Sequence, residues 1–314
     1  MEFQDRVLFG VSALGFISLC HHLFAFLKWL YKMFIRKPKD LRDYGSWAMI
    51  TGSTNGIGRA LAFELASKGL NLVCVGRNPT KLESTAAEIH HKFGERIMIR
   101  NITLDFVKSG PNEISSAIDH GIQGLDIGLL VNNVGIAHAY PRFFHEIEQE
   151  LLETMIRENV EAVIWVTRAV ISEMMKKKKG AIVNIGSGSS VTVSSYPLFT
   201  LYAASKAFMA TFSRSIDLEY QNYGIDVQCQ APLFVRTNMT GLRTNIFIVP
   251  ADVFSRWSVR WMGYDSLCCP FWWHSVQDYI MRSLDALTVR SFFRSFLNMH
   301  REALEANGGY QSHL

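Results

Sequence analysis

The chain lacks several features that would place it in common classes of protein. Its five cysteines form no CxxC pair and show no metal-ligand spacing, which argues against a metal site and favours a reducing compartment. A net charge of +4 is too small to indicate a nucleic-acid partner. There is no internal repeat or low-complexity stretch. Because 48% of the residues are hydrophobic and 19% are charged, we expect a folded protein with a sizeable core.

The run from Val7 to Leu27 contains no Asp, Glu, Lys or Arg. A helix over this run would span about 30 Å, the thickness of a bilayer core. We interpret it as a membrane anchor rather than a signal peptide or a buried soluble helix, because Trp29, Tyr31 and a basic flank follow it. The basic flank predicts that the C-terminal side faces the cytosol. An alternative is that the run lies in the interface as a hairpin.

From residue 46 onward, short apolar runs alternate with helical stretches. This alternation predicts an α/β fold with a Rossmann-like, doubly wound parallel sheet. The predicted strands are WAMIT, NLVCVG, RIMIRNITL, IGLLVNN, AIVNIG and IDVQCQ, and the predicted helices lie near 58–68, 81–93, 114–120, 151–176 and 202–223.

A glycine-rich turn, TGSTNGIG, follows the first predicted strand and opens the first predicted helix. Glycines in this context permit a tight turn and a close approach of the backbone to a pyrophosphate, while the helix N-terminus supplies N–H donors. The strand–turn–helix context distinguishes the motif from an ordinary glycine turn. It predicts a dinucleotide site whose candidate residues are Gly52, Ser53, Thr54, Asn55, Gly56, Ile57 and Gly58.

The second predicted strand ends in VGRN and carries no acidic residue there. A cofactor with a free ribose 2′-hydroxyl needs an acidic acceptor about 20 residues beyond the glycine turn. A guanidinium instead suits a 2′-phosphate, which it binds through paired, charge-assisted hydrogen bonds. We therefore predict NADPH rather than NADH, with Arg77 on the phosphate. The alternative is that Arg77 is a surface cation.

Further motifs occur in the order typical of one family. NNVG closes the fourth predicted strand, Asn159 lies in the next long helix, NIGS ends the fifth strand, and YAASK supplies a YxxxK pattern. The loop PLFVRT resembles a PGxVxT loop, with Leu233 in place of the glycine. Together with the glycine turn, these motifs resemble those of the short-chain dehydrogenases/reductases.

The resemblance implies reduction of a carbonyl group. Tyr202 and Lys206 are i,i+4 partners on one helical face, so the ammonium is expected to lower the pKa of the phenol and Tyr202 to act as general acid. By resemblance, Lys206 also holds the hydroxyls of the nicotinamide ribose. Asn159 keeps a main-chain kink and a water that links Lys206 to solvent.

The serine that bonds the substrate carbonyl has two candidates. Many family members place it thirteen residues before the tyrosine, which gives Ser189, whereas aligning NIGS at the strand end gives Ser187. A strand end fixes a position better than a loop length does, and the turn at 194–197 can absorb two extra residues. We therefore favour Ser187 and keep Ser189 as the alternative.

By the same resemblance, other motif residues lie along the cofactor. They are Asp105 beside the adenine, Asn132 and Gly135 in the cleft, and Pro232, Val235 and Thr237 beside the nicotinamide. Asn133 is expected to tie strands together, and His138 and Tyr196 are interpreted as loop residues.

Four stretches narrow the resemblance. The anchor, VGRNPTKL, IDVQCQAPLFV and WMGYDSLCCPFWWHSVQDYI are similar to the very-long-chain 3-oxoacyl-CoA reductases of the endoplasmic reticulum, plant-type ones in particular. The resemblance implies reduction of 3-oxoacyl-CoA in fatty-acid elongation, a catalytic domain facing the cytosol, other elongation enzymes as partners, and a homodimer. Two alternatives stay open: a hydroxysteroid dehydrogenase acting on another apolar ketone, and a catalytically silent paralogue that binds cofactor as a scaffold.

The C-terminal third is rich in aromatic residues. These suit an apolar substrate, a membrane interface or the packing of extra helices. The predicted organisation is an anchor with its basic flank over 1–40, an NADP-binding core over 45–240, an aromatic segment that covers the substrate or lies near the membrane over 241–300, and a flexible tail over 301–314.

Overall fold

A computed structural model describes residues 3–237, 239, 245 and 247–306. The chain divides into two compact units, Met1–Pro38 and Lys39–Leu314. The first unit consists of the helix α1 (Phe3–Leu30) and a π-helical turn η1 (Tyr31–Ile35). None of the described α1 residues is buried, and by length and composition this helix is a candidate membrane span.

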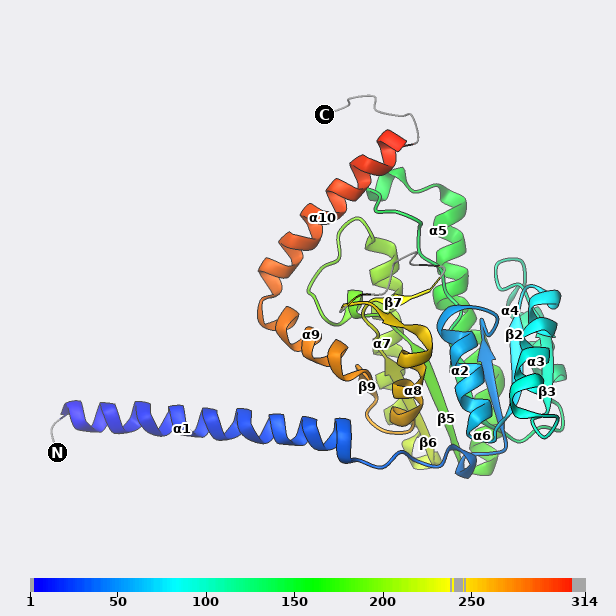
Figure 1. The fold of residues 1–314 in the computed structure, drawn as a ribbon, viewed down its shortest axis with the longest axis horizontal. Helices are drawn as coiled ribbons and strands as arrows, with labels where there is room; N and C mark the ends of the chain where they lie inside the picture. Colours follow the sequence, from blue (N-terminus) through cyan, green and yellow to red (C-terminus); the bar gives the residue numbers. More distant parts are fainter. Residues whose placement is uncertain (1–2, 238, 240–244, 246, 307–314) are drawn as a thin grey trace. The chain divides into compact units, whose positions relative to one another are not determined.

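The second unit is built around a parallel sheet of seven strands in the order β3-β2-β1-β4-β5-β6-β9. Parallel strands need crossover connections, and the chain supplies a helix after nearly every strand (Figure 1). The predicted doubly wound sheet is therefore confirmed, but sequence patterning missed the short strand β9. The strands are β1 (Trp47–Thr51), β2 (Asn71–Gly76), β3 (Ile99–Thr103), β4 (Ile127–Asn132), β5 (Gly180–Ile185), β6 (Ile225–Gln230) and β9 (Leu267–Cys268).

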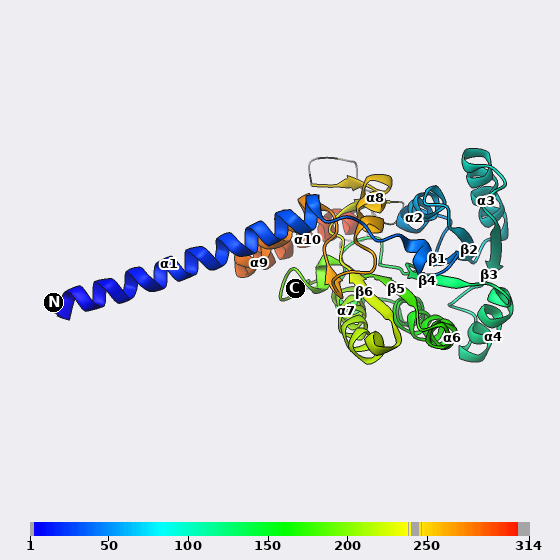
Figure 2. The same ribbon diagram turned by 90° about the horizontal axis from the view of Figure 1, so that it is seen from below.

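Helices cover both faces of the sheet (Figure 2). One face carries α2 (Gly56–Ser67), α3 (Pro79–Phe93) and α8 (Ala251–Trp261); the other carries α4 (Pro111–Ile122), α6 (Ala162–Lys177) and α7 (Thr200–Tyr220). Alternate side chains of one strand serve the two cores: in β1, Ile50 packs with Leu61 of α2, whereas Met49 packs in the cluster of Val166 from α6. Because helices cover both faces, the central strands β1 and β4 are buried along their whole length and are mostly apolar.

The long helix predicted over 151–176 is interrupted. It consists of α5 (Gln149–Ile156), a π-helical turn η4 (Arg157–Glu161) and α6. The N–H of Ala162 donates to the carbonyl of Arg157, five residues earlier, which widens the turn at its centre. The turn contains Asn159, and it shifts the side chains on either side of it.

The C-terminal segment adds a two-stranded parallel sheet and two helices. They are β7 (Val235–Arg236) paired with β8 (Val249–Pro250), then α9 (Trp272–Ser283) and α10 (Asp285–Ala306). Many of the aromatics pack in the core, since Phe254 and Trp261 are buried. The flexible tail predicted from residue 301 is helical as far as Ala306, where α10 ends, and residues 307–314 lie outside the described residues.

The remaining short elements are single helical turns. They are η2 (Leu41–Asp43), η3 (Phe144–Glu146), η5 (Gly188–Ser190) and η6 (Gln221–Tyr223). Of these, η5 bears directly on the site because it follows the carboxyl end of β5.

Candidate active site

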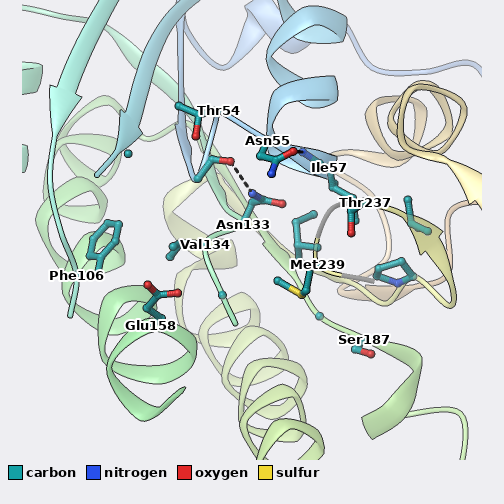
Figure 3. A pocket seen from close by; sticks show the side chains of 18 of the residues that line it. Thr54, Asn55, Ile57, Phe106, Asn133, Val134, Glu158, Ser187, Thr237 and Met239 are labelled. Atoms are coloured by element: carbon teal, nitrogen blue, oxygen red, sulfur yellow. Dashed lines mark hydrogen bonds between the residues drawn. The ribbon is translucent and has the colours of Figure 1, made fainter. Parts of the chain in front are cut away.

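A cleft of about 310 Å³ opens at the carboxyl ends of the parallel strands. Thr54, Asn55 and Ile57 of the glycine turn line one side (Figure 3). Phe106 and Glu158 lie together across the cleft, and Ser187 lies at the other end (Figure 3). The cleft thus lies where the order of the strands reverses between β1 and β4, the usual ligand position in doubly wound sheets.

The glycine turn has the backbone that its sequence predicts. Gly52 and Gly56 adopt φ values of 68° and 52°, a left-handed conformation that favours glycine. A Cβ at position 58 would lie 2.2 Å from the carbonyl oxygen of Gly52, so only glycine fits there. The Asn55 side chain accepts a hydrogen bond of 2.8 Å from the N–H of Gly56 and caps α2. This open turn at a helix N-terminus fits a dinucleotide pyrophosphate.

Two of the predicted turn residues lie behind the cleft rather than in its lining. Ser53 is fully buried, and its hydroxyl lies 3.5 Å from the carbonyl oxygen of Val75. Gly58 packs against the carbonyl of Gly52. The other predicted turn residues, Gly52, Thr54, Asn55, Gly56 and Ile57, line the cleft.

Of the two asparagines of NNVG, Asn132 does not line the cleft as predicted, whereas Asn133 ties the ends of β4 and β1 together as predicted and also lines the cleft. Asn132 is buried away from the cleft and donates to Thr167 and Asn184, at 3.0 and 2.8 Å, so it ties β4 to α6 and β5. Asn133 lines the cleft and donates to the carbonyls of Thr51 and Gly52, at 3.0 and 3.2 Å. Successive residues of a strand point to opposite sides, and a prediction from the motif alone does not fix which side each one takes.

Three charged residues gather at one end of the cleft. Arg77 follows β2 and Asp105 follows β3, as predicted, but Glu158 of η4 is an addition that sequence reasoning missed. The Arg77 guanidinium lies 3.7 Å from the Glu158 carboxylate. Burial raises the pKa of Glu158, Arg77 opposes the rise, and Asp105 adds to it. The only sequence signal for Glu158 was its place next to Asn159.

Tyr202 and Lys206 belong to α7 and line the end of the cleft opposite to the three charged residues. The Lys206 ammonium donates to the carbonyl of Ile185 at 3.0 Å and lies 5.9 Å from the centre of the Tyr202 ring. Burial lowers the pKa of Lys206 to about 8. Burial also raises the pKa of Tyr202, and a hydrogen bond with Ser187 opposes that rise. The structure does not show the predicted lowering of the Tyr202 pKa by Lys206: burial raises this pKa, and the side chain that opposes the rise is Ser187.

Asn159 holds the loop after β4 to the wide turn of η4. Its side-chain oxygen accepts from the N–H of Ile136 at 2.8 Å, and its amide donates to the carbonyl of Ile136 at 2.9 Å. The same amide donates to the Ser205 hydroxyl at 3.0 Å, and that hydroxyl donates to the carbonyl of Tyr202. Asn159 thus connects η4 to α7 at the level of Tyr202.

The two candidate serines differ in what they face. Ser187 follows Gly186 just beyond the end of β5, lines the cleft together with Tyr202, and opposes the rise of the Tyr202 pKa. Ser189 lies in η5 and donates its hydroxyl hydrogen to the Ser187 hydroxyl at 3.0 Å. Ser189 therefore supports Ser187, which is the serine in contact with both Tyr202 and the cleft.

A second pocket of about 460 Å³ meets the cleft at Ser187 and Tyr202. Most of its lining is apolar and comes from the loop after β4, the loop before α7, and the helices α9 and α10. His138 and Tyr196 lie in loops, as expected, and both line this pocket. His138 stacks on Phe199 with 4.5 Å between ring centres, and Tyr196 packs edge-on against Phe292 and Phe296 of α10.

The loop after β6 separates the cleft from the second pocket. Pro232 and Leu233 line both pockets, and Val235 and Thr237 line the cleft as predicted. A Cβ on Gly188 would lie 2.2 Å from the Leu233 side chain, so the leucine at the usual glycine position packs tightly against η5. Residues 238 and 240–244 lie outside the described residues.

The loop between β5 and α7 is fastened to the C-terminal helices. The Thr192 hydroxyl donates to Asp278 of α9 at 2.6 Å, and the N–H of Ser194 donates to Asp285 of α10 at 2.8 Å. Both bonds hold the serine-bearing loop against the elements that enclose the apolar pocket. The C-terminal helices therefore belong structurally to the site.

Comparison with known proteins gives the same assignment as the geometry. A family model described as short chain dehydrogenase matches residues 46–245. A very-long-chain 3-oxoacyl-CoA reductase-like protein of Arabidopsis thaliana is 44% identical over 89% of this chain and 90% of its own length. The human very-long-chain 3-oxoacyl-CoA reductase is 34% identical over 82% and 80%. The human inactive hydroxysteroid dehydrogenase-like protein 1 is 36% identical over 76% and 72%.

Solved structures share the fold. A 7β-hydroxysteroid dehydrogenase superposes with a TM-score of 0.71, at 21% identity, over 81% of this chain and 99% of its own. A short-chain dehydrogenase from Sphingobium yanoikuyae in complex with NADPH superposes with a TM-score of 0.63, at 24% identity, over 85% and 98%. The sheet order, the glycine turn and the family match together show that the chain belongs to the short-chain dehydrogenase/reductase family of oxidoreductases.

Proposed function

We propose that this protein reduces very-long-chain 3-oxoacyl-CoA to 3-hydroxyacyl-CoA, with NADPH as cofactor, in fatty-acid elongation. One observation carries the proposal: Tyr202 and Ser187 line both the cleft that fits a dinucleotide and the apolar pocket that fits an acyl chain. A ketone at this junction would have the cofactor on one side and two hydroxyl groups within reach. When bound, NADPH supplies the hydride.

Residues of the chain stabilise the negative charge that develops on the ketone oxygen. That oxygen needs a proton and hydrogen-bond donors as the carbonyl is reduced. Tyr202 donates the proton and Ser187 donates a hydrogen bond. Lys206 holds the ribose hydroxyls of the nicotinamide half, and Asn159 keeps the turn that connects η4 to Tyr202. At the other end of the cleft, Arg77 binds the 2′-phosphate.

The acyl-CoA assignment has two supports. Two of the relatives named above, at 44% and 34% identity, are named a very-long-chain 3-oxoacyl-CoA reductase-like protein and a very-long-chain 3-oxoacyl-CoA reductase. The second pocket offers the mostly apolar, aromatic lining that a long acyl chain needs. The candidate span α1 and its basic flank support a place in the endoplasmic-reticulum membrane, with the second unit on the cytosolic side. There the protein would meet other elongation enzymes and form a homodimer.

Turnover by membranes that carry the full chain tests the proposal. NADPH oxidation is followed with 3-oxoacyl-CoA substrates of increasing length and with a ketosteroid, and membranes carrying Tyr202→Phe serve as the matched control. We expect turnover of the long acyl substrates that the control lacks. Absence of turnover with every ketone, despite NADPH binding, would refute the reductase role. Release of the protein by a carbonate wash would refute the spanning anchor.

Two other functions have a specific observation in their favour. The same pocket shape would admit a steroid, and turnover of the ketosteroid alone would show a hydroxysteroid dehydrogenase. The similarity to an inactive hydroxysteroid dehydrogenase-like protein favours a silent scaffold. The junction of Tyr202, Ser187 and Lys206 in one cleft argues against the scaffold, because a silent protein has no need of it.

A further inference from the structure

Glu158 is a buried carboxylate inside the cofactor cleft. Its side chain is 9% exposed, and it points into the cleft beside Phe106 (Figure 3). Acidic side chains are seldom buried unless they are paired. Among the residues that the structure describes, Arg77 is the cation within ion-pair distance of Glu158, with 3.7 Å between Nη1 and Oε1.

Arg77 could therefore pair with either of two anions, the Glu158 carboxylate or the 2′-phosphate of a bound NADPH. It follows β2, where the ribose of a bound dinucleotide lies in this fold, and it already faces Glu158 across the cleft. A 2′-phosphate would have to draw the guanidinium from Glu158, whereas a 2′-hydroxyl would leave the ion pair in place. The carboxylate also repels a phosphate more than it repels a hydroxyl.

We propose that Glu158 is a specificity-determining residue of the cofactor site, which holds Arg77 by an ion pair and thereby reduces the preference for NADPH over NADH. This inference rests on the proposed cofactor assignment. Glu158 acts through Arg77, so it is a positioning residue and takes no part in proton transfer to the substrate.

Proton uptake is a second consequence. The charged groups that face Glu158 are Arg77 from the end of β2 and Asp105 from the segment after β3. Once Arg77 binds a 2′-phosphate, the charged group that remains beside the buried Glu158 is the Asp105 carboxylate. Burial and Asp105 both raise its pKa and Arg77 lowers it, so loss of Arg77 favours uptake of a proton by Glu158 when NADPH binds. NADH binding leaves the ion pair intact and takes up none through Glu158.

Equilibrium binding to the full chain in detergent tests the proposal without any turnover. Dissociation constants for NADPH and NADH are measured at fixed pH and ionic strength for the wild type, Glu158→Gln and Glu161→Gln. Glu161 is the matched control, because it is an exposed glutamate of the same turn outside the cleft. We expect Glu158→Gln to tighten NADPH binding about threefold to tenfold and to change NADH binding less than about twofold, while Glu161→Gln changes neither.

Two further measurements separate positioning from a structural effect. Calorimetry in buffers of different ionisation enthalpy should show proton uptake with NADPH in the wild type and less in Glu158→Gln. In a protein that already carries Arg77→Gln, adding Glu158→Gln should tighten NADPH binding much less than it does in the wild type. An unchanged ratio of the two affinities, weaker NADPH binding by Glu158→Gln, or an equal effect of Glu161→Gln would overturn the proposal. Failure of the wild type to bind either cofactor would refute the proposed function as well.

Discussion

The cofactor cleft and the apolar pocket share Tyr202 and Ser187, yet they are built in different ways. Most of the cleft is lined by residues at or directly after the carboxyl ends of parallel strands. The rest of the apolar pocket's lining comes from within residues 137–141, 187–199, 232–234 and 281–299 and from residues 239, 247 and 248, with α9 and α10 supplying the group at 281–299. Short motifs therefore encode the first pocket, whereas long-range packing forms the second. Substitutions in the two pockets should accordingly separate cofactor binding, chemistry and substrate choice.

The largest effect is expected at the junction of the two pockets. Tyr202→Phe removes the proposed proton donor and should lower kcat about 10²–10⁴-fold, the usual contribution of a general acid. The NADPH dissociation constant should stay near that of the wild type, because the ring remains in place. Full activity in this variant would show that another group protonates the ketone.

The two serines should differ strongly in effect. Ser187→Ala removes a donor to the developing oxyanion and should lower kcat about 10²–10³-fold. Ser189→Ala removes a group that only donates to Ser187, so kcat should change only a few-fold. Single-turnover kinetics with a saturating ketone measures both. The reverse order would move the carbonyl contact from the strand end into η5.

The pH dependence of turnover should report Lys206. An ordinary lysine has a pKa of 10.5, and burial lowers that of Lys206 to about 8. Its ammonium is therefore present below about pH 8 and is lost as the pH rises through that value. We expect kcat/KM to fall about tenfold per pH unit on the alkaline side, since one proton is lost. Lys206→Arg keeps the positive charge at alkaline pH, so its kcat/KM should not fall in this way, even though its activity is lower.

The smallest effect is expected in the wall of the apolar pocket. Phe292 lines that pocket, whereas its neighbour Phe293 is 39% exposed and lies outside the lining. Phe292→Ala should raise KM for long acyl substrates about tenfold, with NADPH binding unchanged. Phe293→Ala should leave both constants near wild type. Equal effects of the two changes would mean that α10 acts through stability rather than through the pocket.

The sequence predicted the cleft better than the pocket because strand ends carry local signals. Six of the seven strands, the glycine turn and the placing of Arg77, Asp105 and Thr237 in the cleft follow from short stretches of chain. The errors arose where orientation matters. Asn132 and Asn133 point to opposite sides of one strand end, and Glu158 enters the cleft because η4 is a wide turn rather than regular α-helix.

By itself the sequence determined the fold family, the edge of the sheet where a dinucleotide fits, and the pairing of Tyr202 with Lys206, since periodicity and fixed spacings act over a few residues. Only the tertiary structure decided three matters: which serine faces Tyr202, how α9 and α10 enclose the apolar pocket, and that Glu158 faces Arg77. These depend on the desolvation and packing of segments far apart in the chain, such as the carboxylate of residue 158 beside the guanidinium of residue 77. Burial likewise moves the pKa of Tyr202 upward, which the spacing of the two residues does not predict.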